Sequence, residues 1–281
     1  MPYLLLNWVN NQFPYTRLDG TLVIRDFVCE DLGQHWHQLD KKRKPSRCLS
    51  DLFWMRLSWD KIKEELTEIN VVDTGCGSGI YGKKLLAYSN NGLTTYTGID
   101  ISRDANWAEM EDEYPNFRFC VNRGTNFSES IPEGANFFMT QSAIEHFNED
   151  LSYFEQIRDY TLSYGKSVIQ VHLFPSSYCL WLYLWHGARQ YTPRTVSKIT
   201  RLFRDSSYAV LFRLGGRECN RLHYEFITKP LLIHKRDLRD SKAEEYERRL
   251  RVALERDMEH PQKHPAFLAL VIHSNWSSRI F

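Results

Sequence analysis

The sequence has almost no excess of charge of either sign. Its 281 residues include 36 Lys and Arg against 35 Asp and Glu, a formal net charge of +1. A strong net charge favours nucleic-acid or anionic-membrane partners, and its absence leads us to expect neither. One compact basic run is present, Lys41 to Lys44 with Arg47 nearby. Two interpretations of this run stay open, a solvated loop and a docking patch for a phosphate-bearing substrate.

Paired cysteines and long apolar runs are also missing. Six cysteines are scattered without a C-x-x-C pair, so the sequence predicts reduced thiols and neither a disulfide framework nor a metal site. The longest lipophilic stretch, Tyr178 to Trp185, falls far short of the roughly 20 residues that cross a bilayer. Leu4 to Leu6 is too short for a signal peptide. We therefore expect a cytoplasmic protein without an integral membrane segment.

What the sequence does contain is a regular alternation of short apolar runs and helical patterns from residue 69 onward. Short connections between strand and helix imply a parallel sheet covered by helices on both faces. The pattern predicts an α/β fold with a doubly wound, mostly parallel, seven-stranded, Rossmann-like sheet. The expected strands are residues 69–73, 94–100, 117–121, 136–141, 167–173, 208–214 and 267–273, and the expected helices include 81–88, 150–163 and 193–203.

Two regions stand outside this alternation. Residues 1–66 are expected to form an N-terminal extension that ends in a lead-in helix from Ser50 to Leu66. Residues 67–281 are expected to form the main domain, with acceptor-side insertions at about 174–205 and 215–263. The second insertion contains Glu–Arg pairs four residues apart, such as Glu245 and Arg249, which predict a helix before the last strand.

The most informative stretch is the glycine-rich run from Asp73 to Lys84. A phosphate-binding P-loop would need Ser or Thr where Lys84 stands, so nucleotide hydrolysis is disfavoured. A dinucleotide fingerprint G-x-G-x-x-G begins at Gly77, but a strand ending at Asp73 would start the fingerprint at Gly75 and put Ile80 in place of its third glycine. A nicotinamide-dependent oxidoreductase is therefore a weaker alternative.

A third interpretation takes its register from Asp73. It gives Asp-x-Gly-x-Gly-x-Gly directly after an apolar strand, with glycines at 75, 77 and 79 that let the backbone approach a bulky ligand. In this register the chain resembles the class I S-adenosylmethionine-dependent methyltransferases. Residues 97–102 resemble the family's second motif, and residues 137–147 resemble its fourth strand and the turn that carries a Glu-His pair. The resemblance covers about residues 69 to 175.

The resemblance implies S-adenosyl-L-methionine as cofactor. It implies that the Asp100 carboxylate accepts hydrogen bonds from both ribose hydroxyls. The residues expected to contact the cofactor are Asp73, Gly75, Cys76, Gly77, Gly79, Asp100, Ile101, Asn122, Gln141 and Ser142.

The chain departs from the family pattern at two places. The acid that usually faces the adenine amine is replaced by Asn122, whose side-chain carbonyl can accept a hydrogen bond, or by Arg123, which has no acceptor. Metal-dependent relatives carry an acid at the position of Ser142, so we expect no metal.

The ends of the fourth and fifth strands each carry a histidine, His146 and His172. Ligands of a doubly wound sheet lie outside the carboxyl ends of its strands, so both are candidate general bases for a hydroxyl acceptor. The alternative is a structural role for either ring. We favour His172 slightly, because it precedes the acceptor-side insertion.

The aromatic segment 178–191 offers candidate acceptor contacts in His186, Arg189 and Tyr191. Aromatic rings stack on sugar faces, and arginine binds phosphate or carboxylate in a bidentate manner. A buried amphipathic helix is the competing interpretation.

The leading functional hypothesis is O-methylation of a sugar or glycan hydroxyl, because the chain is similar to methyltransferases of bacterial polysaccharide pathways. Methylation of a small aromatic or natural-product acceptor uses the same residues. A nicotinamide-dependent oxidoreductase or a binding module that keeps the cofactor without turnover are alternatives of other classes.

Overall fold

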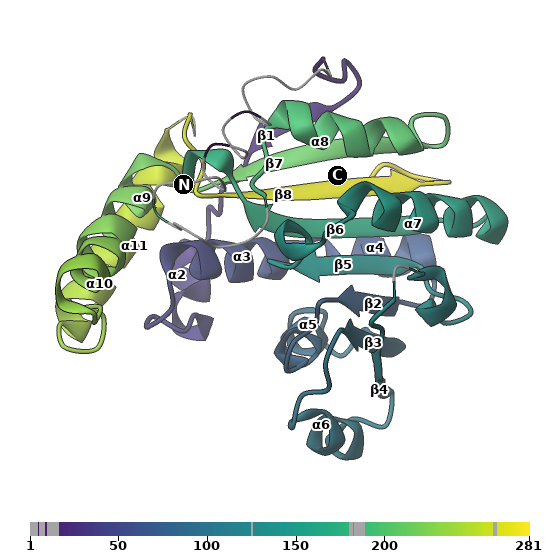
Figure 1. The fold of residues 1–281 in the computed structure, drawn as a ribbon, viewed down its shortest axis with the longest axis horizontal. Coiled ribbons are helices and arrows are strands. Elements are labelled where there is room, and N and C mark those ends of the chain that lie inside the picture. The colour runs from purple at the N-terminus through teal and green to yellow at the C-terminus, as the bar shows by residue number, and fades with distance from the viewer. Residues whose placement is uncertain are drawn as a thin grey trace.

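Eight strands form one sheet in the computed structural model, which describes residues 17–124, 126–179, 189–260 and 263–281 together with residues 5, 9 and 182. The strands lie in the order β1-β7-β8-β6-β5-β2-β3-β4, from the top to the bottom of Figure 1. Their bounds are β1 Val23–Asp26, β2 Asn70–Thr74, β3 Thr95–Asp100, β4 Phe117–Val121, β5 Phe137–Gln141, β6 Val168–Pro175, β7 Ser207–Leu214 and β8 Phe267–Ser274.

The sheet is parallel except for β8, which lies antiparallel between β6 and β7. From β2 the chain runs outward through β3 to β4 and then returns to β5 on the other side of β2. This reversal of strand order leaves a crevice outside the carboxyl ends of β2 and β5, where doubly wound folds bind their ligands. The predicted fold class is confirmed.

The sheet has eight strands instead of the predicted seven. The additional strand, β1, comes from the N-terminal extension and pairs in parallel with β7 at the edge of the sheet. It has only four residues, and Val23 is 41% exposed. A short edge strand with half-exposed side chains lacks the apolar run that marks the other strands, so the sequence pattern did not reveal it.

Ten helices are described on the two faces and at the carboxyl end of the sheet. Their bounds are α2 Leu32–His35, α3 Pro45–Met55, α4 Trp59–Leu66, α5 Ile80–Tyr88, α6 Trp107–Glu113, α7 Asp150–Tyr164, α8 Pro193–Thr200, α9 Arg217–His223, α10 Lys229–His234 and α11 Ala243–Glu259. One core cluster joins the sheet to α3, α4, α5, α9 and α11, and a second joins the opposite face to α7 and α8. None of these helices is long and apolar enough to cross a membrane.

The predicted helix from Ser50 to Leu66 is two helices. The first, α3, begins five residues earlier, at Pro45, where the missing N–H costs no helical hydrogen bond. It ends at Met55, and the Trp59 ring then closes the turn by donating from Nε1 to the Trp54 carbonyl at 3.0 Å. Because Leu49, Leu52 and Trp54 are fully buried, α3 is part of the core.

The predicted helical insertion before the last strand is present as α9, α10 and α11. Figure 1 shows these helices as a group beyond the ends of the central strands. The apolar side of α11, with Tyr246, Leu250 and Leu254, is buried as expected. Its Glu245 and Arg249 form the expected ion pair at 3.8 Å, whereas Glu247 pairs with Lys41 of the N-terminal region at 3.2 Å. The insertion is thereby tied to the basic run.

Candidate functional site

The turn between β2 and α5 contains three glycines, and backbone conformation or close packing favours glycine at each of them. Gly75, Gly77 and Gly79 all have positive φ, at +74°, +53° and +79°. A Cβ at Gly75 would collide with the Ala143 side chain, and one at Gly79 would lie 2.5 Å from the Phe119 ring. A Cβ at Gly77 would meet nothing within 4 Å, so this residue borders open space. The turn therefore packs at both ends, and its middle faces open space.

Asp100, the last residue of β3, is fixed against this turn. One carboxylate oxygen accepts from the Gly77 N–H at 2.8 Å and the other accepts from the Ile101 N–H at 2.7 Å. The Trp107 ring donates to the Gly77 carbonyl at 2.8 Å and holds the same residue from the other side. A carboxylate oxygen can accept more than one hydrogen bond, so both oxygens retain capacity for a pair of hydroxyl donors.

A cleft of about 490 Å³ opens at this edge, at the carboxyl ends of β2, β3, β4 and β5. This volume lies within the range of roughly 300 to 1,000 Å³ that small-molecule sites occupy. Ile101 is 71% exposed, an unusual position for an isoleucine, and it lines the cleft. The described lining is Thr74, Gly75, Ile99, Asp100, Ile101, Asn122, Arg123, Gly124, Phe127, Ser142, Ala143, His146, Phe147, Asn148, Glu149, Ser152, Tyr153 and Gln156.

Five of the ten predicted cofactor residues line this cleft: Gly75, Asp100, Ile101, Asn122 and Ser142. Asn122 also shapes the loop beyond β4, because its amide donates to the Asn126 carbonyl and to Ser130, and its carbonyl accepts from the Gly124 N–H. Sequence reasoning missed the aromatic wall of Phe127, Phe147 and Tyr153, since these residues reach the cleft from a loop and a helix of the opposite face.

Three other predicted contacts involve buried side chains that do not line the cleft. Asp73 is buried and accepts from the Tyr96 hydroxyl at 2.7 Å, and burial raises its pKa to about 7. Gln141 accepts from the Trp54 ring at 2.8 Å and donates to Ser50 at 3.2 Å. The Cys76 thiol is buried under the turn, where burial raises its pKa. These side chains support the turn from the core, and their direct contact with the cofactor stays a prediction.

Ser142 has the most unusual backbone at this edge. It follows β5 with φ +59°, a left-handed conformation that side-chain-bearing residues seldom adopt, and its N–H donates to the Leu173 carbonyl at 2.7 Å. Strained residues held in place by surrounding structure concentrate at functional sites. Ser142 lines the cleft and also a second, smaller cavity behind it.

Glu145 lies buried beside Ser142. Burial raises the pKa of its carboxyl to about 7, against the lowering effects of Ser142 and of the Arg47 charge. A carboxyl in this state changes protonation near neutral pH.

The two candidate bases lie in different surroundings. His146 lines the cleft, and partial burial lowers its pKa. His172 is fully buried, with one ring nitrogen 3.1 Å from the Thr140 hydroxyl and the other 3.4 Å from the Gln170 carbonyl oxygen. The Phe154 ring packs edge-on against it, and burial lowers its pKa to about 3. This burial favours the structural role for His172 over the predicted role as base, because a base must reach the proton that it removes.

Two of the predicted acceptor contacts, Arg189 and Tyr191, do not line the cleft. Arg189 forms an ion pair with Asp150 and donates to the Asn148 carbonyl at 2.8 Å. Tyr191 is 2% exposed and donates to the same aspartate at 2.8 Å. Both side chains brace the chain against α7 through Asp150, and their contact with an acceptor stays a prediction. His186 lies outside the described residues.

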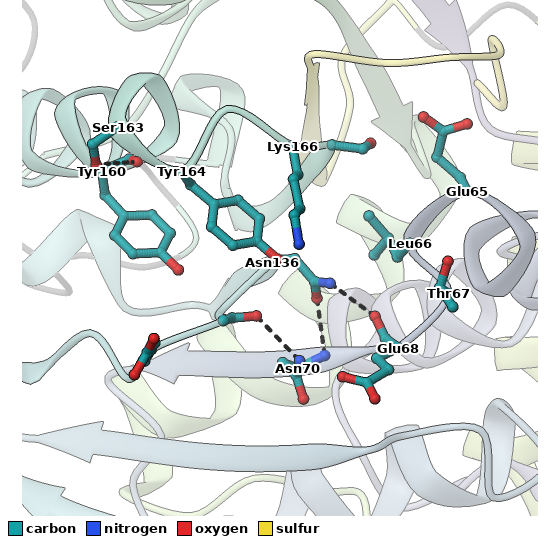
Figure 2. Close-up of a pocket in the computed structure, with 13 residues that line it drawn as sticks. Glu65, Leu66, Thr67, Glu68, Asn70, Asn136, Tyr160, Ser163, Tyr164 and Lys166 are labelled. Carbon is teal, nitrogen blue, oxygen red and sulfur yellow. Dashed lines mark hydrogen bonds between the residues drawn. The ribbon is translucent and has the colours of Figure 1, made fainter.

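A cavity of about 720 Å³, larger than the cleft, lies at the opposite edge of the sheet, among residues at the amino ends of β2, β5 and β6. Figure 2 shows Tyr160, Tyr164 and Lys166 on one side of it and Leu66, Thr67 and Glu68 on the other. The Asn136 side chain at its centre is hydrogen-bonded to backbone groups, because its amide oxygen accepts from the Asn70 N–H at 2.9 Å and its amide nitrogen donates to the Glu68 carbonyl at 2.8 Å. One glycine with positive φ, Gly134, lies in its lining.

Comparison with known proteins gives distant structural likenesses. No protein-family model and no curated protein matches the chain. The solved structures similar to it include the plantazolicin methyltransferase BamL, in complex with a triazolic desmethylPZN analog and SAH, at 15% identity, 87% of this chain, 91% of that chain and TM-score 0.47. A SAM-dependent methyltransferase from Archaeoglobus fulgidus matches at 18% identity, 87% of this chain, 99% of that chain and TM-score 0.45.

A third solved structure, an S-adenosylmethionine-dependent methyltransferase from Mesorhizobium loti, matches at 12% identity over 77% of this chain and 95% of that chain, with TM-score 0.45. Because the identities and TM-scores are low, these likenesses assign no role to any residue of this chain.

Proposed function

We propose that this chain is an S-adenosyl-L-methionine-dependent methyltransferase that uses the carboxyl-edge cleft. The observation that carries the proposal is the joint placement of Asp100 and Gly77: an acceptor-only carboxylate fixed at the rim of a glycine turn whose middle faces open space. A ribose presents two adjacent hydroxyl donors, and a carboxylate is the side chain that accepts from both.

The residues of the cleft suit the rest of this ligand. Ile101 and Phe127 offer apolar surface for a nucleobase beside Asp100, and Thr74 and Gly75 line the opposite end. When bound, the cofactor supplies a methyl group made electrophilic by its sulfonium. The protein contributes position: holding two reactants in line is valued at roughly 7 to 11 kcal/mol of the barrier.

His146 is the candidate base that remains for a hydroxyl acceptor. It lies in the cleft wall one residue after the buried Glu145, and its lowered pKa keeps the imidazole neutral at physiological pH. A neutral imidazole in reach of a hydroxyl proton contributes roughly 10² to 10⁴-fold to a rate. A sugar or glycan hydroxyl remains the proposed acceptor group, with a small natural-product molecule as second candidate.

Calorimetry tests the cofactor directly. We expect the chain to bind S-adenosylmethionine and its demethylated product and not NAD, and we expect Asp100→Ala to weaken binding at least tenfold, because charge-assisted hydrogen bonds contribute about 1.5 to 3 kcal/mol each. Asp112→Ala, the same substitution at an exposed position on α6, is the control. NAD binding without S-adenosylmethionine binding would assign the cleft to a dinucleotide enzyme instead.

A further inference from the structure

A second cavity of about 290 Å³ lies next to the cleft, and four of its described lining residues are cationic: Arg43, Lys44, Arg47 and Arg239. None of the described residues that line it is acidic. Ser142, Ser46, Pro175 and Phe267 complete the wall. Its volume is small for a whole ligand and suits one charged group of a larger one.

Two distant segments build this cavity. The basic run precedes and enters α3, and Arg239 comes from the insertion between α10 and α11. The Arg239 guanidinium donates to the Lys42 carbonyl at 2.8 Å, and the Tyr246 hydroxyl of α11 donates to the Arg43 carbonyl at 2.7 Å. These bonds hold the cations of both segments around one space.

Three of the four cations lie near carboxyl groups outside the cavity lining: Asp40, Asp237 and Glu145. Arg43 pairs with Asp40 at 3.0 Å, and Arg239 pairs with Asp237 at 2.8 Å. The pKa of Lys44 is lowered by burial and then by the charges of Arg239 and Arg47, with Asp237 opposing. Cations that mutually destabilise their charged forms indicate a site that an anion would stabilise.

The position of the cavity relates it to methyl transfer. Along the carboxyl edge, Asn122 follows β4, Asp100 ends β3, the glycine turn follows β2 and Ser142 follows β5. With the ribose at Asp100 and the adenine toward β4, the methyl-bearing end of the cofactor would lie toward Ser142. The cationic cavity begins at Ser142 and continues to Pro175 of β6 and Phe267 of β8. The cleft proposed for the methyl donor and the cationic cavity therefore share one lining residue, Ser142.

We propose that the cationic cavity binds a phosphate or carboxylate group of the methyl acceptor and so holds the acceptor at Ser142, beside the cleft. The role of the ligand as methyl acceptor rests on the proposed methyltransferase function, whereas binding of the anion does not depend on it. Arginine and lysine together recognise oxyanions through charge-assisted hydrogen bonds, and a phosphate at neutral pH carries more charge than a carboxylate.

The test measures binding of glucose 1-phosphate, glucuronate and glucose to the full chain by calorimetry at low salt. We expect binding of one or both anionic sugars, no binding of glucose, and weakening as salt is added. Glucose 1-phosphate alone would identify a phosphorylated acceptor, and glucuronate alone an acidic sugar. Lys44→Gln and Arg47→Gln should each weaken anion binding about tenfold and leave S-adenosylmethionine affinity within twofold. Lys44→Arg should retain anion binding.

Lys42→Gln is the matched control, because Lys42 belongs to the same basic run, its side chain is 75% exposed, and it does not line the cavity. Equal anion binding in Lys44→Gln, Arg47→Gln and Lys42→Gln, or binding of glucose as tight as that of the anions, would overturn the proposal. Anion binding that responds to these variants in a chain that binds no S-adenosylmethionine would keep the anion site and reject the methyltransferase function.

Discussion

The two edges of the sheet differ in a way that cavity size does not show. The amino edge has the larger hollow, about 720 Å³ against about 490 Å³, but the Asn136 side chain at its centre is hydrogen-bonded to backbone groups. Positive φ occurs at both edges, at Gly75 and Ser142 beside the cleft and at Thr67 and Gly134 beside the amino-edge cavity. What the carboxyl edge has in addition is the Asp100 carboxylate, which is fixed against the glycine turn and keeps acceptor capacity to spare. A polar group held ready for a ligand, more than volume or strained backbone, distinguishes this edge.

The sharpest way to break this comparison is one substitution made at both edges. Gly77 at the carboxyl edge and Gly134 at the amino edge both have positive φ, and a Cβ would have no contact within 3.5 Å at either. We expect Gly77→Val and Gly134→Val to lose similar stability, on the order of 1 to 3 kcal/mol, from backbone strain. Only Gly77→Val should abolish S-adenosylmethionine binding. Calorimetry and thermal unfolding of both variants check this, and equal binding in the two would place the ligand elsewhere.

The next comparison separates the two histidines by turnover. We expect His146→Ala to lower kcat on the order of 10²-fold and to leave cofactor affinity nearly unchanged, because a base acts in the transition state. His172→Ala should keep its kcat in the folded fraction and lose stability instead. Single-turnover rates beside thermal melts distinguish these outcomes. Near-normal turnover of His146→Ala would leave catalysis to positioning or to another base.

Buried His172 also predicts an acid limb of stability. Its folded-state pKa, about 3, lies below the unfolded value of about 6.5, so its contribution is present above pH 6.5 and is lost as pH falls toward 3. The loss is at most about 1.4 kcal/mol per pH unit for one group. His172→Gln removes this titration. Between pH 7 and pH 4, the free energy of unfolding measured with denaturant should fall less steeply with falling pH in the variant than in the native chain. An equal pH dependence in the two would contradict the assignment.

Asp73 predicts the opposite sign. Burial raises its pKa from 3.8 to about 7, so its contribution to stability is full below about pH 4 and is lost as pH rises through 7. Asp73→Asn keeps an acceptor for the Tyr96 hydroxyl and cannot ionise. The stability of the variant relative to the native chain should therefore rise between pH 5 and pH 8. A pH-independent difference would show that Asp73 does not titrate in this range.

The smallest expected effect is that of a chelator. No group of three or more His, Cys, Asp or Glu in the described chain could hold a metal ion, and Ser142 stands where metal-dependent relatives are expected to carry an acid. We expect methyl transfer to be unchanged by chelator within error. Activity lost in chelator and restored by Mg²⁺ would contradict this.

The strands of the central sheet were predictable because their apolar runs are local and end in recognisable turns. The expected strand 117–121 coincides with β4, and the expected last strand differs from β8 by one residue. The end of β6 was not predictable in this way. The strand was expected to stop at residue 173, just after His172, but it continues to Pro175, so His172 lies within the strand and faces α7.

The sequence by itself determined the alternation of strands and helices along the chain from residue 69, the glycine turn after β2 and the carboxylate at the end of β3. Each of these depends on residues close together in the chain. Only the tertiary structure decided which side chains reach the cleft. It placed the aromatic wall of Phe127, Phe147 and Tyr153 in the cleft that Asp100 also lines, paired β1 with β7, and brought the basic run to Arg239, 197 residues from Lys42. Contacts at such separation depend on how the sheet is wound and how its faces are covered, and no local pattern of residues specifies them.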